Sequence, residues 1–263
     1  MVFEPLFVEE RKRAILDDLR KNGRVSVKTL SDAMGVSTVT IRQDLRALGE
    51  EGLLERTYGG AVNRVVETSM PEQSFHVRQK RHRDAKTAIA AAAADLVQEG
   101  FSVGMDASTT AYALVPYLKK FNKLTILTNS LVIAQSFLDS PQIQVMLPGG
   151  RLRRDSISIV GRPEGLPDLN LNVCFMSGRG VTLTEGVSDV DPDEVMMKQA
   201  MIARSVSTVI LLDASKWGQV APFTVIKVQQ LERLITSADV SVLMLEQFRS
   251  AGIHIQITNV IDS

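Results

Sequence analysis

Apolar residues at helical spacing mark a short amphipathic segment early in the chain. Within residues 36–48 (VSTVTIRQDLRAL), Ile41, Leu45 and Leu48 recur at i, i+4 and i+7 and therefore share one face of an α-helix. Ser37 is a suitable N-cap, because its hydroxyl can accept a hydrogen bond from the first turn. The opposite face carries Val39, Arg42, Gln43 and Arg46. The pattern predicts a helix of about three turns with one buried and one exposed face.

The segments on either side of this helix extend the pattern. Upstream, residues 13–21 and 25–35 carry two more apolar stripes at helical spacing, and a glycine-containing turn connects the second stripe to the helix that follows. Downstream, residues 53–62 (LLERTYGGAV) have the pattern of a strand, a Gly-Gly turn and a returning strand. Three helices followed by a hairpin predict a winged helix-turn-helix.

The exposed face of the 36–48 helix has side chains that can read base edges. In the major groove, Arg donates to guanine O6 and N7, and Gln pairs with adenine N6 and N7. A plain solvated face is the alternative interpretation, and the neighbouring helices and hairpin favour DNA binding over it. We therefore expect double-stranded operator DNA as a partner, contacted by Ser37, Thr38, Val39, Thr40, Arg42, Gln43 and Arg46 on the helix and by Arg56, Tyr58 and Gly59 in the hairpin.

From residue 84 onward, short apolar runs alternate with helical stretches. The clearest predicted strands are FSVGM, LTILT, IQVML, VCFM, TVILLD and HIQIT. Strands joined by crossover helices imply a mostly parallel sheet covered on both faces, so the predicted fold class is α/β. We divide the chain into a winged helix-turn-helix at 1–62, a polar linker at 63–83 and an α/β domain at 84–263.

Polar loops follow four of the predicted strands. They contain Asp106–Thr110, Asn129–Ser130, Pro148–Arg151 and Ala214–Lys216. In open α/β sheets ligands bind at the carboxyl ends of the strands, and hydroxyls with backbone N–H groups at a helix start suit a phosphate. One such loop is weak evidence, because Ser, Thr and Asn also cap helices without binding anything. Four loops on strand ends favour a ligand site.

Charge limits how strongly one copy can bind DNA. The formal net charge is zero, with 15 Lys+Arg against 12 Asp+Glu in residues 1–83 and 15 against 18 in residues 84–263. Non-specific affinity grows with the number of phosphates neutralised, so it should be modest for one copy. One three-turn helix also reads only a few base pairs, which predicts a homodimer or homotetramer. The basic cluster Arg78, Lys80, Arg81 and Arg83 fits either DNA phosphate contacts or a solvated helix start.

The remaining composition predicts no metal, cofactor or membrane partner. The single cysteine, Cys174, lies in the apolar run NVCFM, where a buried inert thiol is expected. No signal peptide and no apolar run of about 18 residues is present, so we expect a cytoplasmic protein. His76, His82 and His254 are scattered, and no Cys/His pair has the spacing of a zinc site.

Residues 10–62 resemble the DNA-binding domain of the DeoR family of bacterial transcriptional regulators. That family has the pattern TIRRDL, then L, then G-L-L-x-R-x-H-G-G-A, and this chain matches at Thr40, Ile41, Arg42, Asp44, Leu45, Leu48, Gly52, Leu53, Arg56 and Gly59 to Ala61. It departs at Gln43, where Arg is usual, and at Tyr58, where His is usual. Both positions are expected to face DNA, so a relative's operator sequence cannot be transferred to this chain.

The second part resembles the sugar-phosphate sensor domain of the same family, which is related in fold to ribose-5-phosphate isomerase. The matching features are Asp106–Thr110, Thr128–Ser130, Pro148–Gly150, Gly161, Glu194 with Lys198, and Leu212–Lys216. The resemblance implies that Ser108, Thr109 and Thr110 take the phosphate, and that Asn129, Asp213 and Lys216 contact the sugar. The full expected set of effector-binding residues is Asp106, Ser108, Thr109, Thr110, Asn129, Ser130, Gly149, Gly150, Arg151, Arg179, Lys198, Asp213 and Lys216.

The resemblance implies a repressor of a carbohydrate-metabolism operon that a phosphorylated sugar releases from DNA. The alternative is a sugar-phosphate isomerase-like or transferase-like enzyme fused to a DNA-binding domain. Isomerisation needs a carboxylate base, and Arg179 stands where relatives usually carry the Asp of G-A-D-G. Asp106 and Asp213 leave catalysis open, but the intact winged helix favours sensing, so we expect no enzyme activity and no catalytic residues.

Arg179 itself has two interpretations. If it enters the pocket, it adds positive charge that suits a second acidic group on the ligand. Alternatively, it pairs with Glu185 or Asp189 at the surface.

Overall fold

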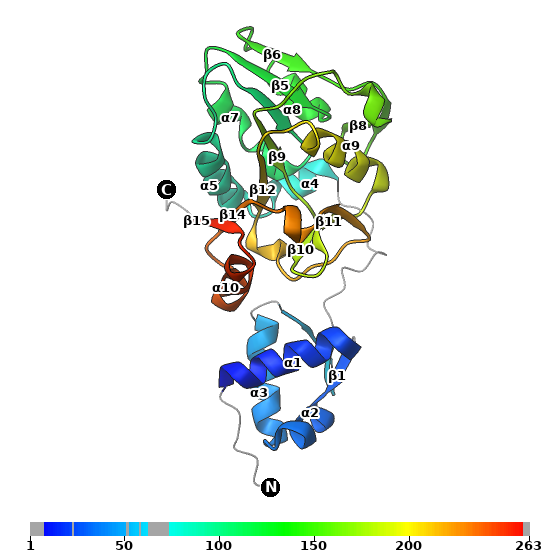
Figure 1. Ribbon diagram of the computed structural model, residues 1–263, viewed down its shortest axis with the longest axis vertical. Helices are drawn as coiled ribbons and strands as arrows, with labels where there is room; N and C mark the ends of the chain where they lie inside the picture. The colour runs from blue at the N-terminus through cyan, green and yellow to red at the C-terminus, as the bar shows by residue number, and fades with distance from the viewer. Residues whose placement is uncertain (1–7, 23, 51–52, 58, 63–73, 260–263) are drawn as a thin grey trace. The chain divides into compact units, whose positions relative to one another are not determined.

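The computed structural model describes residues 8–22, 24–50, 53–57, 59–62 and 74–259. The chain forms two compact units (Figure 1). No helix within the described ranges is long and apolar enough to cross a membrane.

The N-terminal unit contains three helices and a small antiparallel sheet. Its elements are α1 (Val8–Asn22), β1 (Arg24–Ser26), α2 (Val27–Met34), α3 (Thr38–Glu50), β2 (Glu55–Thr57) and β3 (Gly60–Val62). β3 lies between β1 and β2 and pairs antiparallel with both. The predicted hairpin is therefore present, and β1 adds a strand that the sequence pattern did not indicate.

Caps and a shared core fix these helices. Ser26 caps α2 by accepting a hydrogen bond from Thr29 N at 3.0 Å. The helix ends at Gly35, whose φ of 65° lies in the left-handed region that glycine adopts without steric cost. Of the apolar stripe predicted within residues 25–35, Leu30 is buried, Met34 is half-buried and Ala33 is exposed. The buried core of the unit includes Ile15, Leu16, Leu19, Leu30, Ile41, Leu45 and Leu48.

The larger unit is built on a seven-stranded sheet in the order β15-β14-β12-β9-β4-β5-β6, and all neighbouring strands are parallel. The strands are β4 (Ser102–Met105), β5 (Leu124–Thr128), β6 (Ile143–Met146), β9 (Val173–Met176), β12 (Thr208–Leu212), β14 (Arg233–Ser237) and β15 (His254–Thr258). The chain runs outward from β4 through β5 to β6 and then returns to β9, on the other side of β4. The strand order therefore reverses between β4 and β9.

Both faces of the sheet are buried. One face packs on α5 (Arg83–Ala94), α6 (Thr109–Tyr112), α7 (Val115–Leu118) and α8 (Leu131–Ser136), in a core that includes the strand residues Val103, Ile126 and Phe175. Cys174 and Ile210, which alternate with that set, are also fully buried. Burial raises the pKa of the Cys174 thiol well above its ordinary value, as expected for an inert thiol. Burial on two faces explains why the strands are continuous apolar runs.

The remaining elements surround this sheet (Figure 1). They are α4 (Phe75–Lys80), α9 (Pro192–Ile202), α10 (Val242–Ser250), the hairpin of β7 (Arg151–Arg153) and β8 (Ser158–Val160), the antiparallel sheet of β10 (Gly180–Thr182), β11 (Gly186–Asp189) and β13 (Phe223–Ile226), and the 3-10 turns η1 (Pro163–Gly165), η2 (Ala214–Lys216) and η3 (Val228–Gln230). The predicted architecture, a winged helix-turn-helix followed by a mostly parallel α/β domain, is confirmed.

Part of the segment predicted as a linker is helical. The linker was placed at 63–83, but residues 75–80 form α4 and α5 begins at Arg83; residues 63–73 lie outside the described ranges. α4 is held by Phe75, whose side chain is fully buried and whose N–H donates to Asp155 O at 2.8 Å. Its ring also meets Tyr112 edge-on, with 5.5 Å between the ring centroids. A single buried aromatic in a six-residue helix leaves no periodic signal in a polar stretch, which is why the pattern missed it.

Candidate functional site

The face of α3 predicted to read DNA lies at the surface of the N-terminal unit. Ser37 caps the helix, its Oγ accepting from Thr40 N at 3.1 Å. Val39 is 59% exposed, which leaves an apolar side chain available to contact a thymine methyl group. Thr40 is half-buried, and the exposed residues of the predicted set are Ser37, Thr38, Val39, Arg42, Gln43 and Arg46.

The buried face of α3 holds a charge pair that the sequence pattern did not reveal. Asp44 accepts two hydrogen bonds from Arg11 of α1, with Nε–Oδ2 at 2.5 Å and Nη2–Oδ1 at 3.1 Å. The hydrogen bond that Arg11 donates to Asp44 raises the pKa of Arg11 above its ordinary value. Both residues are buried, so this bidentate pair ties α1 to α3 and fixes the direction in which α3 presents its exposed face.

The wing consists of β2 and β3, which pair antiparallel with Thr57 opposite Gly60. Of the predicted wing contacts, Arg56 and Gly59 are exposed, whereas Tyr58 lies outside the described residues. A Cβ at Gly60 would come within 1.9 Å of Val25 O. The close pairing of β3 with β1 therefore requires glycine at this position.

A pocket in the larger unit lies where the strand order reverses. Three loops that follow neighbouring strands contribute to it: Ala107–Thr110 after β4, Ser177–Arg179 after β9, and Asp213, Ser215 and Lys216 after β12. Loops on the two sides of a reversal diverge, and the crevice between them is the usual ligand site of an open α/β sheet. The fold therefore brings Ser108, Thr109 and Thr110 together with Arg179, Asp213 and Lys216, as predicted, around one cavity.

A buried charge network lies beside the pocket. Lys198 of α9 has its Nζ 2.8 Å from Asp106 Oδ2, 2.7 Å from Asp189 Oδ2 and 2.7 Å from Ser177 O. Burial opposes the ammonium charge, but Asp106, Asp189 and Glu194 outweigh it and raise the pKa of Lys198 above its ordinary value. Asp106 also accepts from Ser177 N at 2.9 Å. Lys198 and Asp106 therefore hold the β4 and β9 loops together.

Two other lysines in the pocket have depressed pKa values. Burial lowers the pKa of Lys86 to about 8, and the nearby cations Lys216, Arg78 and Arg179 add to the shift against the opposing charge of Asp213. Burial also lowers the pKa of Lys216, with Asp213 again opposing and the same two arginines contributing. Both shifts are due mainly to burial, and the neighbouring cations add a smaller contribution of the same sign.

Arg179 is positioned by close packing of its loop. A Cβ at Gly178 would come within 2.5 Å of Val187 Cγ1, so glycine permits the loop to approach β11. Arg179 N donates to Ser188 O at 2.8 Å, and its Nε lies 3.8 Å from Asp189 Oδ1. The side chain also lines the pocket. Both interpretations of Arg179 therefore hold in part, because it pairs with Asp189 and faces the cavity.

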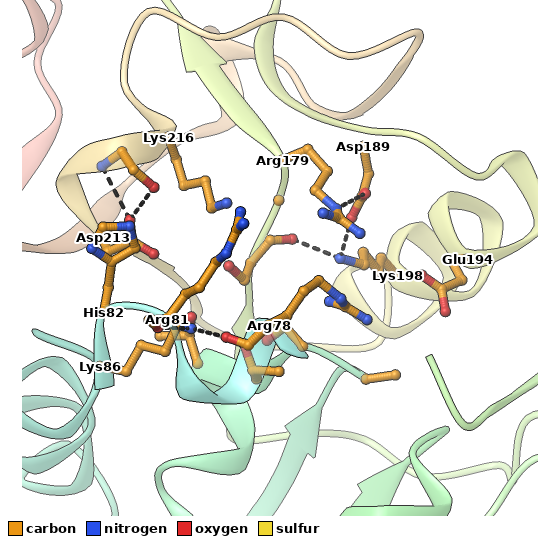
Figure 2. A pocket seen from close by; sticks show the side chains of 17 residues that line it. Arg78, Arg81, His82, Lys86, Arg179, Asp189, Glu194, Lys198, Asp213 and Lys216 are labelled. Carbon is orange, nitrogen blue, oxygen red and sulfur yellow. Dashed lines mark hydrogen bonds and ion pairs between the residues drawn. The ribbon is translucent and has the colours of Figure 1, made fainter. Parts of the chain in front are cut away.

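Ten residues of the pocket lining lie outside the predicted effector-binding set, and four of them precede β4 in the chain. Arg78, Arg81 and His82 come from the segment assigned to the linker, and Lys86 comes from α5. Figure 2 shows Arg78 and Arg81 reaching into the pocket from one side, with Arg179 and Lys216 on the other. Lys86 donates from Nζ to the carbonyl oxygens of Arg78 and Arg81, each at 2.6 Å, and so ties this segment to α5. The basic cluster noted in the sequence thus contributes two arginines to the pocket.

Six predicted effector-binding residues lie outside this pocket lining. Asp106 is one of them, and it contacts the lining through Lys198. The other five, Asn129, Ser130, Gly149, Gly150 and Arg151, follow β5 and β6, which lie beyond β4 and away from the reversal, and strands in a sheet are spaced by about 4.8 Å. Asn129 O accepts from Ile159 N at 2.7 Å, and Asn129 Nδ2 donates to Ile159 O at 3.2 Å, so the β7–β8 hairpin engages this loop. Arg151 forms an ion pair with Asp193.

The charge balance of the pocket is positive. Its lining contains six Lys or Arg side chains and three Asp or Glu side chains. Glu194, one of the three acids, accepts from Ser158 Oγ at 2.8 Å, and burial raises its pKa above the ordinary value. Within the described part of the chain, no group of three or more His, Cys, Asp or Glu residues could hold a metal ion. The site therefore favours anions over metal cations.

Comparisons with known proteins cover both units. A family model described as the DeoR-like helix-turn-helix domain matches residues 11–64, and one described as the DeoR C-terminal sensor domain matches residues 81–238. The HTH-type transcriptional regulator GolR of Listeria innocua is 33% identical over 254 residues, covering 96% of this chain and 99% of the relative. The HTH-type transcriptional repressor GlcR of Bacillus subtilis is 30% identical over 233 residues, covering 88% of this chain and 89% of the relative.

Among solved structures, ribose 5-phosphate isomerase A from Methanocaldococcus jannaschii aligns with a TM-score of 0.38 and 15% identity, covering 51% of this chain and 54% of the other. A similarity of this size carries no argument about activity.

Proposed function

Because the chain belongs to the DeoR family of DNA-binding transcriptional regulators, we propose that it represses a carbohydrate-metabolism operon and that a phosphorylated sugar releases it from the operator. The observation that carries this proposal is the positively charged pocket at the strand-order reversal of the sensor domain. A neutral sugar would leave several half-buried cations facing uncharged groups, whereas a phosphate ester supplies the counter-charge.

On the DNA side, the exposed face of α3 enters the major groove and the wing lies against the backbone. Arg42, Gln43 and Arg46 are the base-reading candidates, because they are exposed on one face and carry the donors that purine edges accept. Val39 adds an apolar contact. Ser37, Thr38, Thr40, Arg56, Tyr58 and Gly59 complete the proposed DNA-binding set.

On the effector side, we propose that the phosphate lies against the hydroxyls of Ser108, Thr109 and Thr110, and that Lys216 contacts the sugar. Asp213 offers acceptors to sugar hydroxyls; it is buried and is itself oriented by Ser215 N, which donates to its Oδ1 at 3.0 Å. Asn129, which follows β5 and lies outside the pocket lining, stays a proposed sugar contact on that side of the β4 loop, because its buried Oδ1 accepts no hydrogen bond within the described residues.

The pocket senses its ligand and does not turn it over. The relatives named above are transcriptional regulators, and Arg179, which stands in the middle loop of the pocket, stays protonated and cannot act as a general base. Incubating the protein with ribose 5-phosphate should give no ribulose 5-phosphate. Turnover above the rate of a Lys198→Met variant would point to an isomerase instead.

Two or more copies act together on the operator. One short recognition helix contacts too few base pairs to select one site in a genome, so the account requires a homodimer or homotetramer. Sedimentation at micromolar concentration should give a mass at least twice the 28.9 kDa of one chain. A monomer mass, with and without DNA, would contradict it.

The test of the proposed function is a thermal-shift screen of sugars and their phosphate esters. A ligand at 100 times its dissociation constant adds about 2.7 kcal/mol of stability, which is readily measured. We expect phosphorylated sugars alone to stabilise the protein, and the Thr109→Ala and Lys216→Ala variants to lose the response. Equal stabilisation by unphosphorylated sugars would contradict the proposal.

A further inference from the structure

The three loops that line the pocket have a fixed order. Because the sheet order is β12-β9-β4, the β9 loop with Arg179 lies between the β4 loop with Thr109 and the β12 loop with Asp213. Under the proposed function, the phosphate lies against the β4 loop and sugar hydroxyls reach the β12 loop. The body of the ligand must therefore pass Arg179.

The lining of the pocket carries more cations than carboxylates. Lys198 directs its three donors to Asp106, Asp189 and the Ser177 carbonyl, so that lysine is compensated internally. Even when Asp106 is added to the three acids of the lining, six cations face four carboxylates. The excess is spread over the cavity, since Arg78 and Arg81 reach in from the α4 side while Arg179 and Lys216 face them (Figure 2).

The cations also disfavour one another. Arg78 and Arg179 both contribute, after burial, to the lowered pKa of Lys216 and of Lys86. One phosphate is a compact group that occupies a single part of the cavity. Its charge of about −1.5 to −2 can satisfy the cations next to it but leaves a guanidinium on the middle loop facing neutral sugar carbons and hydroxyls.

We propose that the effector carries a second anionic group, a carboxylate or a second phosphate, and that Arg179 binds it together with Arg78. The planar guanidinium fork matches the paired oxygens of either group, and Arg179 is held in place by its backbone bond to Ser188 and its contact with Asp189. This inference rests on the proposed function, because it assumes that the pocket binds a phosphorylated sugar.

Matched pairs of probes test it by calorimetric titration at constant ionic strength. Each pair shares a sugar phosphate and differs by one anionic group: glucose 6-phosphate with 6-phosphogluconate, and fructose 6-phosphate with fructose 1,6-bisphosphate. Inorganic phosphate serves as the baseline for a single anion. We expect the member with two anionic groups to bind at least about tenfold more tightly in at least one pair, since a charge-assisted hydrogen bond supports that ratio. Equal affinity within both pairs would overturn the inference while leaving the proposed function intact.

The variant Arg179→Gln tests the assigned residue, and Arg249→Gln, at an exposed position of α10, is the matched control. In Arg179→Gln the preference for two anionic groups should fall to less than about threefold, because the variant should lose much more affinity for the doubly anionic member of a pair than for the monophosphate. The control should keep the preference. A variant that weakens both members of a pair equally would contradict the assignment to Arg179. If no phosphorylated probe binds to the parent protein at 10 mM, whereas an unphosphorylated sugar does, the proposed function and this inference both fail.

Discussion

Polar and charged side chains on the exposed face of α3 and in the buried network of the sensor domain have opposite physical settings. Arg42 and Gln43 stand in water on one helix whose cap and buried face are complete without them. Lys198 and Asp106 are buried in a network that joins three segments of the chain. An exposed charge such as Arg42 can change without affecting the fold. The buried charges of Lys198 and Asp106 contribute both to stability and to ligand binding.

The largest expected effect comes from breaking the buried network. Replacing Lys198 with Met leaves Asp106 and Asp189 buried without their shared cation, which should lower the free energy of unfolding by about 3 to 5 kcal/mol. Chemical denaturation followed by circular dichroism would measure it. Lys123→Met, at an exposed position, should change stability by less than about 0.5 kcal/mol. Similar values for the two variants would show that the network does not stabilise the unit.

Arg42→Ala tests the exposed face of α3. The change should weaken binding to the promoter DNA by about 1 to 3 kcal/mol and leave the free energy of unfolding within about 0.5 kcal/mol of the parent. Fluorescence anisotropy with labelled DNA measures the first quantity, and denaturation measures the second. A loss of specificity at one base pair indicates a base contact, whereas uniform weakening indicates a phosphate contact. Unchanged DNA affinity would remove Arg42 from the reading face.

The depressed pKa of Lys86 predicts a smaller, pH-dependent effect. As the pH rises from 7 to 9 through the value of about 8, the ammonium loses its proton and effector affinity should fall, by roughly three- to tenfold. Between about 8 and the ordinary 10.5 the folded state binds fewer protons than the unfolded state, so this group makes stability rise with pH in that window. Titrations at pH 7, 8 and 9 check the affinity. Lys86→Arg, which stays charged, should flatten the profile; an equally steep profile would rule out Lys86 as its source.

The smallest expected effect is at Arg151, which the family resemblance assigns to the effector. Because Arg151 is exposed, pairs with Asp193 and lies outside the pocket lining, Arg151→Ala should change effector affinity by less than about twofold. Thr109→Ala is the comparison variant and should weaken binding by about tenfold. A large loss in Arg151→Ala would mean that the β6 loop closes over the ligand.

The sequence could predict the features that depend on nearby residues, and it could not predict those that depend on tertiary structure. Helical periodicity is local, so Ile41, Leu45 and Leu48 identified the buried face of α3 and, by exclusion, its exposed face. The end of a strand can also be recognised from nearby residues, and this placed Thr109 and Asp213 in loops that follow strands. Strand order is not local, so the sequence could not show that the β5 and β6 loops lie on the far side of β4 from the pocket.

Two features of the molecule could not be predicted from local periodicity. Arg78 was missed as a pocket residue because α4 is too short to show a period, and only Phe75 beside the basic cluster hinted at an ordered segment. Asp44 matched the family pattern, but its role was invisible because its partner, Arg11, lies 33 residues away on another helix. In both cases the missing information is tertiary contact.

The most direct test of the account measures DNA affinity with and without ligand in two proteins. The ligand is the phosphorylated sugar that gives the largest thermal shift, used at saturation, and the proteins are the parent and Lys216→Ala. The account predicts that the parent loses at least about 100-fold in affinity for its promoter DNA, since release requires the ligand to bind the DNA-incompetent state better by that factor. Lys216→Ala should lose less than about threefold. A parent protein that binds the ligand yet keeps its full DNA affinity would contradict the central claim that this pocket controls DNA binding.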